Sequence, residues 1–93
     1  MLAESYYLLR SQQDGQYVTA RPRDPQERFL LLFRENFEAR SYLNTHGEDM
    51  GDRFGVEAIG QTQLKALLNR WGFQGVGIVT DPLIPTVDFL TYF

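Results

Sequence analysis

The sequence predicts one small α/β domain over residues 1–93, with a mixed sheet of five or six strands, two main helices and an N-terminal β-hairpin. Three observations predict it. Residues 28–80 alternate in the order strand, helix, strand, helix, strand. A turn signal separates two apolar segments near the N-terminus, and one helix carries a continuous leucine stripe. Ninety-three residues are enough for one domain and too few for two.

The N-terminal hairpin is predicted from the dipeptide Asp14-Gly15. Glycine adopts positive φ at little cost and aspartate tolerates it, so this pair is typical of a tight turn. Residues 6–10 and 16–21 supply the two arms. Two prolines then place a loop over residues 21–25, because proline cannot donate to a β-ladder.

The central strand and the first helix come next. Phe29–Phe33 is apolar on both alternating faces, which is typical of a strand that is covered on both sides. Asn36 is a suitable N-cap, and Glu38 lies in the first turn, where the helix dipole favours a negative charge. Ala39 and Leu43 are four residues apart and share one helix face.

The second helix is predicted over residues 63–71, after a strand at residues 54–59. Its apolar side chains follow a spacing of i, i+3, i+4 and i+7, which forms one stripe. The stripe consists of Leu64, Leu67, Leu68 and Trp71. Thr62 is the expected N-cap and Gly72 the expected C-terminal stop.

Glycines surround the start of the next strand, at residues 75–79. Gly72, Gly75 and Gly77 resemble a phosphate-binding loop only in their spacing, because they follow a helix and enter a strand. A dinucleotide-binding loop has the opposite order. The interpretation that we favour is a helix C-cap followed by strand positions where a neighbour packs closely.

Composition excludes several classes of function. The chain has no cysteine, which excludes disulfides, thiol catalysis and iron–sulfur clusters. The net charge of −3 argues against a nucleic-acid binder, and we expect no cofactor. The first residues do not resemble a secretory signal, and no apolar run approaches the roughly 20 residues that a membrane span needs. We therefore expect a cytoplasmic protein.

Catalytic and metal-binding residues are few. His46 is the only histidine, and with Arg34 or Arg53 it forms the basis of an alternative hypothesis, a small enzyme or ligand-binding domain. Three carboxylates follow it, at Glu48, Asp49 and Asp52. Their spacing does not match an EF-hand loop, so a solvated loop is the favoured interpretation. We predict no catalytic residue and no metal ligand.

A second alternative is RNA binding through the region from Arg21 to Arg28, which also contains Arg23. Arginines and aromatic side chains on one sheet face can hold RNA bases and phosphates. Acidic residues are interleaved here, Asp24 and Glu27 among them, and they would neutralise much of the positive charge. A mixed, solvated surface is therefore favoured over a nucleic-acid footprint.

The C-terminal segment is dominated by large apolar side chains, whereas chain ends are usually polar. It is predicted either as a last strand that completes the core or as an exposed edge that pairs with another chain. The second interpretation gives the candidate partner-binding residues Val87, Phe89, Leu90, Tyr92 and Phe93.

Residues 28–88 resemble the SseB-type amino-terminal domain, a small α/β module of bacteria. The resemblance lies in Phe29–Phe33 running into the first helix, in the leucines of the second helix, and in the strand that follows and ends at Asp81-Pro82. The chain departs from the family in its apolar tail and in lacking the usual downstream region. The resemblance implies a non-enzymatic accessory or protein-binding role, with no catalytic residues to transfer.

These observations together favour a non-enzymatic protein-interaction or accessory-subunit module. Its contacts would be made through a sheet edge and the apolar C-terminal segment, with another protein or with a second copy of the chain.

Overall fold

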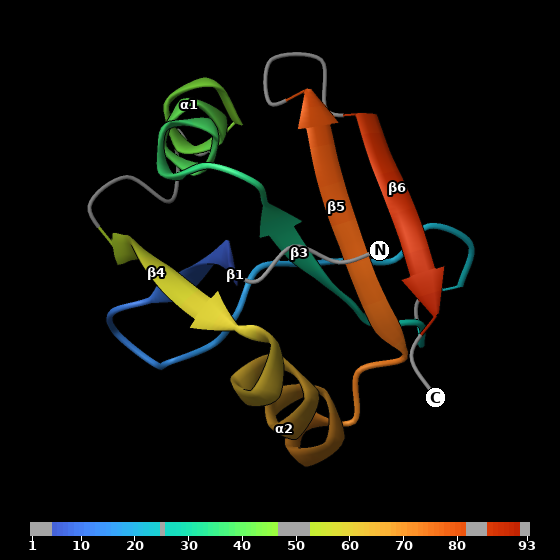
Figure 1. Cartoon of the computed structure of the whole chain (residues 1–93). Coiled ribbons are helices and arrows are strands. Elements are labelled where there is room, and N and C mark those ends of the chain that lie inside the picture. The colour runs from blue at the N-terminus through green and yellow to red at the C-terminus, as the bar shows by residue number, and fades with distance from the viewer. Residues whose placement is uncertain (1–4, 25, 47–52, 82–85, 92–93) are drawn as a thin grey trace.

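The computed structural model describes residues 5–24, 26–46, 53–81 and 86–91 (Figure 1). They form six strands and two α-helices, as predicted. The elements in chain order are β1 (Ser5–Ser11), β2 (Thr19–Ala20), β3 (Phe29–Phe33), α1 (Asn36–His46), β4 (Phe54–Gly60), α2 (Gln61–Trp71), β5 (Gly75–Asp81) and β6 (Thr86–Thr91).

The sheet is mixed, in the order β4-β1-β3-β5-β6, with β2 paired to the first half of β3. Strands β3 and β5 are parallel, with Phe29 opposite Gly75 and Phe33 opposite Val79. The other strand pairs are antiparallel. The chain connects β3 to β5 through both helices and β4, which lies at the far edge of the sheet.

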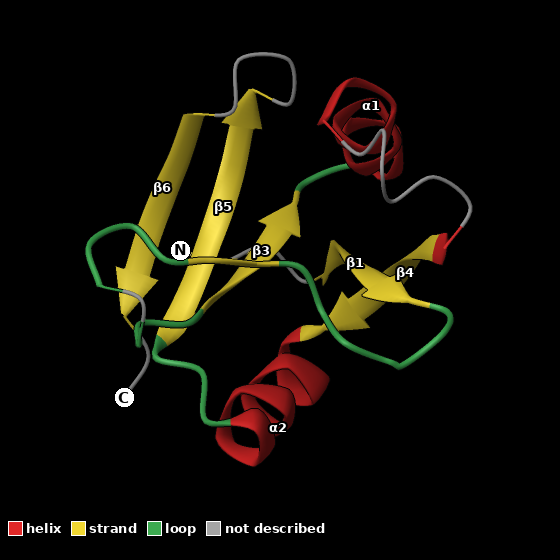
Figure 2. Cartoon of the chain, turned by 180° about the vertical axis from the view of Figure 1, so that it is seen from behind, coloured by secondary structure: helices red, strands yellow, loops and turns green. Residues whose placement is uncertain are grey.

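The two helices cover opposite faces of the sheet. All five residues of β3 are buried, as its apolar sequence predicts. Alternate side chains of a strand point to opposite faces, so Leu30 and Leu32 join the core under α2 while Leu31 and Phe33 join the core under α1. Figures 1 and 2 show β1, β3 and β4 between α1 and α2, with β5 and β6 to one side. The fold therefore has three layers.

The predicted N-terminal turn is present. The backbone N–H of Ser11 donates to the carbonyl of Gln16 at 2.7 Å, and Gly15 adopts a φ of 73°. An Asp14 carboxylate oxygen accepts from the Gln16 N–H at 3.0 Å, and this bond lowers the pKa of Asp14. The pair Asp14-Gly15 thus forms the turn for the reasons that its residue types suggest.

The return arm of this hairpin leaves β1 early. The Val18 N–H donates to the Leu9 carbonyl at 3.1 Å, while the Val18 carbonyl accepts from Leu31 on β3 at 3.1 Å. The chain then pairs with β3 as the two-residue strand β2. The second arm is therefore shorter than the predicted residues 16–21, because β3 takes over as its partner.

The first helix begins at Asn36 and ends at His46, but Asn36 does not cap it. The Glu35 carbonyl accepts the first helical bonds, from the N–H groups of Glu38 and Ala39 at 3.1 and 3.3 Å. The Asn36 side-chain oxygen instead accepts from Arg40 at 2.8 Å. The predicted cap was wrong because Asn36 is already the first residue of the helix, and Glu35 stands at the N-cap position.

The second helix starts two residues earlier than predicted, and Gln63 rather than Thr62 closes its N-terminus. The Gln63 side-chain oxygen accepts from the Gly60 N–H at 3.1 Å. At the other end Gly72 takes the left-handed conformation with φ 69°, as predicted. The Phe73 N–H then donates to the Leu68 carbonyl at 3.0 Å, the bond that defines a Schellman motif.

The predicted leucine stripe of α2 faces the sheet. Leu64 and Leu68 are buried, and Leu67 and Trp71 pack against the same core while partly exposed. Both helices have 11 residues, and within the described ranges neither is long and apolar enough to cross a membrane.

Two glycines of β5 allow β6 to lie close. A Cβ atom at Gly75 would overlap the carbonyl oxygen of Leu90. A Cβ atom at Gly77 would lie 2.8 Å from Val87 Cγ1 and 3.1 Å from Phe89 Cε1. The prediction that neighbours pack closely on these glycines is confirmed.

We expect Gly75→Ala to lower the free energy of unfolding by about 1–3 kcal/mol, because the backbone of β6 must move to admit the methyl group. Gly55→Ala is the matched control. There the added Cβ meets only the flexible end of Gln12, so a change under about 1 kcal/mol is expected. Urea unfolding measures both. Equal losses would contradict a tight β5–β6 contact.

Tyr42 packs on Phe33 with ring centroids 5.3 Å apart, and burial raises the pKa of Tyr42 above its ordinary value of 10.0. The neutral phenol is the form that the fold favours. The neutral Tyr42 phenol therefore adds to the free energy of unfolding below about pH 10, and this stabilisation is lost as the pH rises through the higher pKa of the folded state. Urea unfolding at about pH 8 and about pH 11 should show a smaller pH effect in Tyr42→Phe than in the parent. The same effect in both would exclude Tyr42 as its source.

Candidate functional site

The C-terminal strand β6 belongs to the sheet and also forms one of its edges. It pairs with β5, and no other strand in the described ranges lies on its outer side. Val87 is half-buried in the core under α1, and the ring of Phe89 meets that of Phe29 at a centroid distance of 5.2 Å. The segment was predicted as either a core strand or an exposed edge. In the structure β6 contributes side chains to the core and also forms an edge of the sheet.

The described part of β6 is nevertheless largely exposed. Phe89 is 39% exposed and Leu90 46%. Only one other large apolar side chain in the described ranges is exposed, Phe37 on α1. The candidate residues Tyr92 and Phe93 lie outside the described residues.

Edge strands commonly carry lysine, proline or several charges, which discourage pairing with another chain. In β6 the sequence is Thr-Val-Asp-Phe-Leu-Thr, with Asp88 as its one charged residue. At the opposite edge, β4 also has one charged residue, Glu57, but exposes no large apolar side chain, whereas β6 exposes Phe89 and Leu90. Of the two edges, β6 therefore offers the more apolar surface.

The residues of the His46 hypothesis are only partly described. Helix α1 ends at His46, but its side chain and the acidic residues 48–52 lie outside the description. Arg34 donates to the Thr80 carbonyl at 3.1 Å and lies 3.5 Å from a carboxylate oxygen of Glu38, so it ties α1 to β5. Among the described residues no group of acidic or histidine side chains could hold a metal ion.

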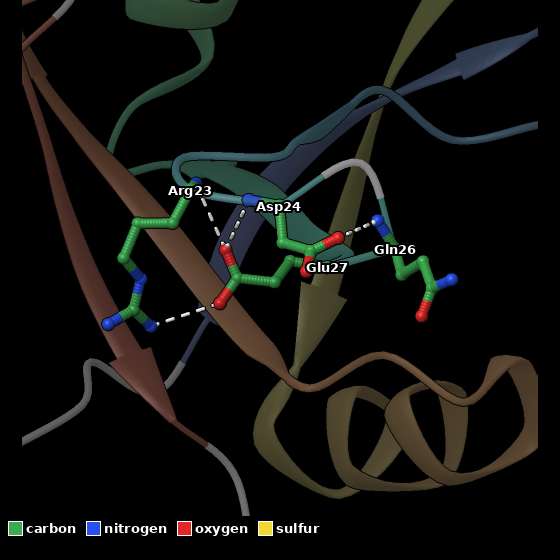
Figure 3. A network of polar contacts seen from close by, with 4 residues as sticks. All are labelled: Arg23, Asp24, Gln26 and Glu27. Carbon is green, nitrogen blue, oxygen red and sulfur yellow. Dashed lines mark hydrogen bonds and ion pairs between the residues drawn. The ribbon is translucent and has the colours of Figure 1, made fainter.

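The arginines of the RNA hypothesis separate into two environments. Figure 3 shows that Arg23 binds Glu27: its Nη2 lies 3.0 Å from one carboxylate oxygen, and the other accepts from the backbone N–H of Arg23 at 3.0 Å. Asp24 in turn accepts from the N–H of Gln26 at 2.8 Å. Arg23 is therefore neutralised within its own loop, as the interleaved charges suggested.

Arg28 points the other way, toward the C-terminal end of α2. Its Nη1 donates to the Trp71 carbonyl at 3.2 Å, and its Cζ lies 4.8 Å from the centre of the Phe73 ring. The residue thus closes the helix end and packs on an aromatic face at once.

An open groove of about 770 Å³ lies beside this contact. It is lined by Gln16, Tyr17, Thr19, Arg21, Arg28, Arg70, Trp71 and Phe73. The helical pattern alone places Trp71 in the core stripe and Arg70 on the solvent side of α2, and it does not join them to Arg21 and Arg28. The sequence feature that points to the groove is the run Arg70-Trp71-Gly72-Phe73. That Arg28 lies beside this run follows only from the pairing of β3 with β5.

Comparison with protein-family models, with curated proteins and with solved structures found no match to this chain. The resemblance to the SseB-type domain therefore stays a prediction from the residue pattern.

We expect Arg28→Lys to lower the free energy of unfolding by about 1–2 kcal/mol. A lysine keeps the charge but loses the flat contact with Phe73 and the directed bond to the Trp71 carbonyl. Arg40→Lys is the control, since Arg40 is exposed and binds only the Asn36 side chain, so almost no change is expected. Urea unfolding followed by Trp71 fluorescence measures both. Equal effects would mean that Arg28 does not hold the helix end.

Proposed function

We propose that this chain is a non-enzymatic protein-interaction module, an accessory subunit whose docking element is the outer edge of β6. One observation carries the proposal: this edge strand combines an outer side that no described strand covers with two exposed large apolar side chains, Phe89 and Leu90. Exposed strand edges and exposed apolar side chains are both typical of protein interfaces.

The mode of binding that fits is addition of one strand to the sheet. Main-chain hydrogen bonds along β6 would supply affinity, and side-chain contacts would supply specificity. Phe89 shares the α1 side of the sheet with Leu31, and Leu90 lies on the α2 side, opposite Val76. An added strand would thus find one apolar contact on each face.

The charge of β6 indicates what the partner carries. Asp88 lies two residues before Leu90 and on the same face, so a basic side chain beside it would be favoured. A second copy of β6 brings no basic residue, and two copies of a chain with net charge −3 repel one another. We therefore propose an extended segment of another protein, with apolar and basic residues in alternation.

The test is selection of peptides from a displayed random library against the purified full-length chain. We expect enriched peptides to combine apolar with basic residues. Leu90→Lys should weaken their binding at least about tenfold, because a charge on an edge strand opposes addition of another strand. Phe37→Lys is the matched control, since it also replaces an exposed apolar residue but on α1, and it should bind like the parent.

Asp88→Lys adds a second measurement. If Asp88 selects the basic residue, a library selected against this variant should be enriched in acidic peptides instead. Peptides that bind Leu90→Lys as tightly as the parent would exclude the β6 edge. Sedimentation that shows a dimer of the parent but not of Leu90→Lys would make a second copy the occupant, against the partner proposed.

A further inference from the structure

Three aromatic rings form one wall of the groove at the C-terminal end of α2. The rings of Tyr17 and Trp71 meet edge to face at 5.0 Å, and those of Trp71 and Phe73 are nearly parallel, 6.2 Å apart. Tyr17 also meets Phe73 edge to face at 6.5 Å. The wall is therefore a packed cluster and does not depend on one mobile side chain.

Three guanidinium groups share this groove, and no carboxylate lines it among the described residues. Arg28 uses one nitrogen on the Trp71 carbonyl, which leaves further N–H groups of the same fork available. Arg21 and Arg70 are exposed, and within the described part of the chain neither side chain forms an ion pair or a hydrogen bond. The three come from the loop after β2, the residue before β3 and the last turn of α2, so they meet only in the folded chain.

We propose that this groove binds a nucleotide, with the phosphates on Arg21, Arg28 and Arg70 and the base against Trp71. Guanidinium groups bind phosphate oxygens through paired hydrogen bonds, and nucleotide bases stack on aromatic side chains. Gln16 and Thr19 add an amide and a hydroxyl to the lining. The volume of about 770 Å³ lies in the range of small-molecule sites.

A single nucleotide fits the charges of the chain better than a nucleic-acid strand does. A strand extends its phosphates beyond the groove, where a protein of net charge −3 repels them. Arg23, the nearby arginine that would lengthen a basic track, is paired with Glu27. Arg21 and Arg28, which have no carboxylate partner among the described residues, both line the groove, whereas the paired Arg23 does not.

The helix end alone does not account for these arginines. The negative end of the α2 dipole stabilises the positive charges of Arg28 and Arg70. Arg21 belongs to the loop after β2 and makes no contact with the helix end of this kind. Its place in the groove adds a third like charge close to two others, an arrangement that an anion stabilises.

The test is calorimetric titration of the full-length chain with ATP, tripolyphosphate and adenosine. We expect ATP to bind at least about tenfold more tightly than either of the other two, because only ATP offers both the phosphates and the base. Trp71 is the only tryptophan, so its fluorescence should change when tripolyphosphate, which does not absorb in this region, enters the groove.

The double variant Arg21→Gln/Arg70→Gln should weaken ATP binding at least about tenfold. Its matched control, Arg40→Gln/Lys65→Gln, removes the same number of positive charges from exposed residues outside the groove and should stay within about twofold of the parent. Far-UV circular dichroism checks that both remain folded. Absence of ATP binding to the parent, or equal losses in the two double variants, would overturn the proposal. So would an oligoadenylate strand that binds far more tightly than ATP, since the site would then serve nucleic acid.

Discussion

The parallel pairing of β3 with β5 is the interaction on which the rest of the structure depends. It buries all five residues of β3, and their side chains supply the centre of both cores. It also places the residues that precede the two strands side by side: the Gln74 N–H donates to the Arg28 carbonyl at 2.9 Å. The groove forms there because Phe73 and the end of α2 arrive next to Arg28. On its other side β5 supplies the surface that β6 covers.

Glycine at two positions of β5 explains how the last strand of the sheet also packs into the core. Gly77 leaves room over the sheet, and the side chains of Val87 and Phe89 fill it from β6. Phe89 thereby reaches Phe29 on β3, two strands away, while more than a third of its surface stays exposed. A side chain at residue 77 would push the ring outward and lose the contact with the core. The two glycines thus account for the close packing of this strand, while its position at the sheet edge leaves Phe89 and Leu90 exposed.

Strong local patterns made the fold predictable from the sequence, and competing side chains made its details unpredictable. The apolar run of β3 fits only a strand covered on both faces, and the leucine stripe of α2 fits only one orientation of the helix, because any other arrangement would expose apolar side chains. The N-caps do not have this property. Asn36 and Thr62 both lie inside their helices, and the N-cap positions are taken by Glu35 and Gly60. Local sequence patterns could not predict the groove, because Arg28 and Trp71 lie 43 residues apart in the chain and are brought together only by the register of β3 and β5.

The interleaving of arginines with acidic residues predicts a neutral mixed surface only if every arginine finds a nearby carboxylate. The fold divides them instead. Arg23 and Arg34 each pair with a glutamate four residues along, because a turn and a helix start bring residues at that spacing together. Arg28 has no such partner among the described residues, since it leads into an extended strand, where residues four apart share a face but lie about 13 Å from each other. A net negative chain therefore keeps a local excess of positive charge where extended backbone meets the end of α2.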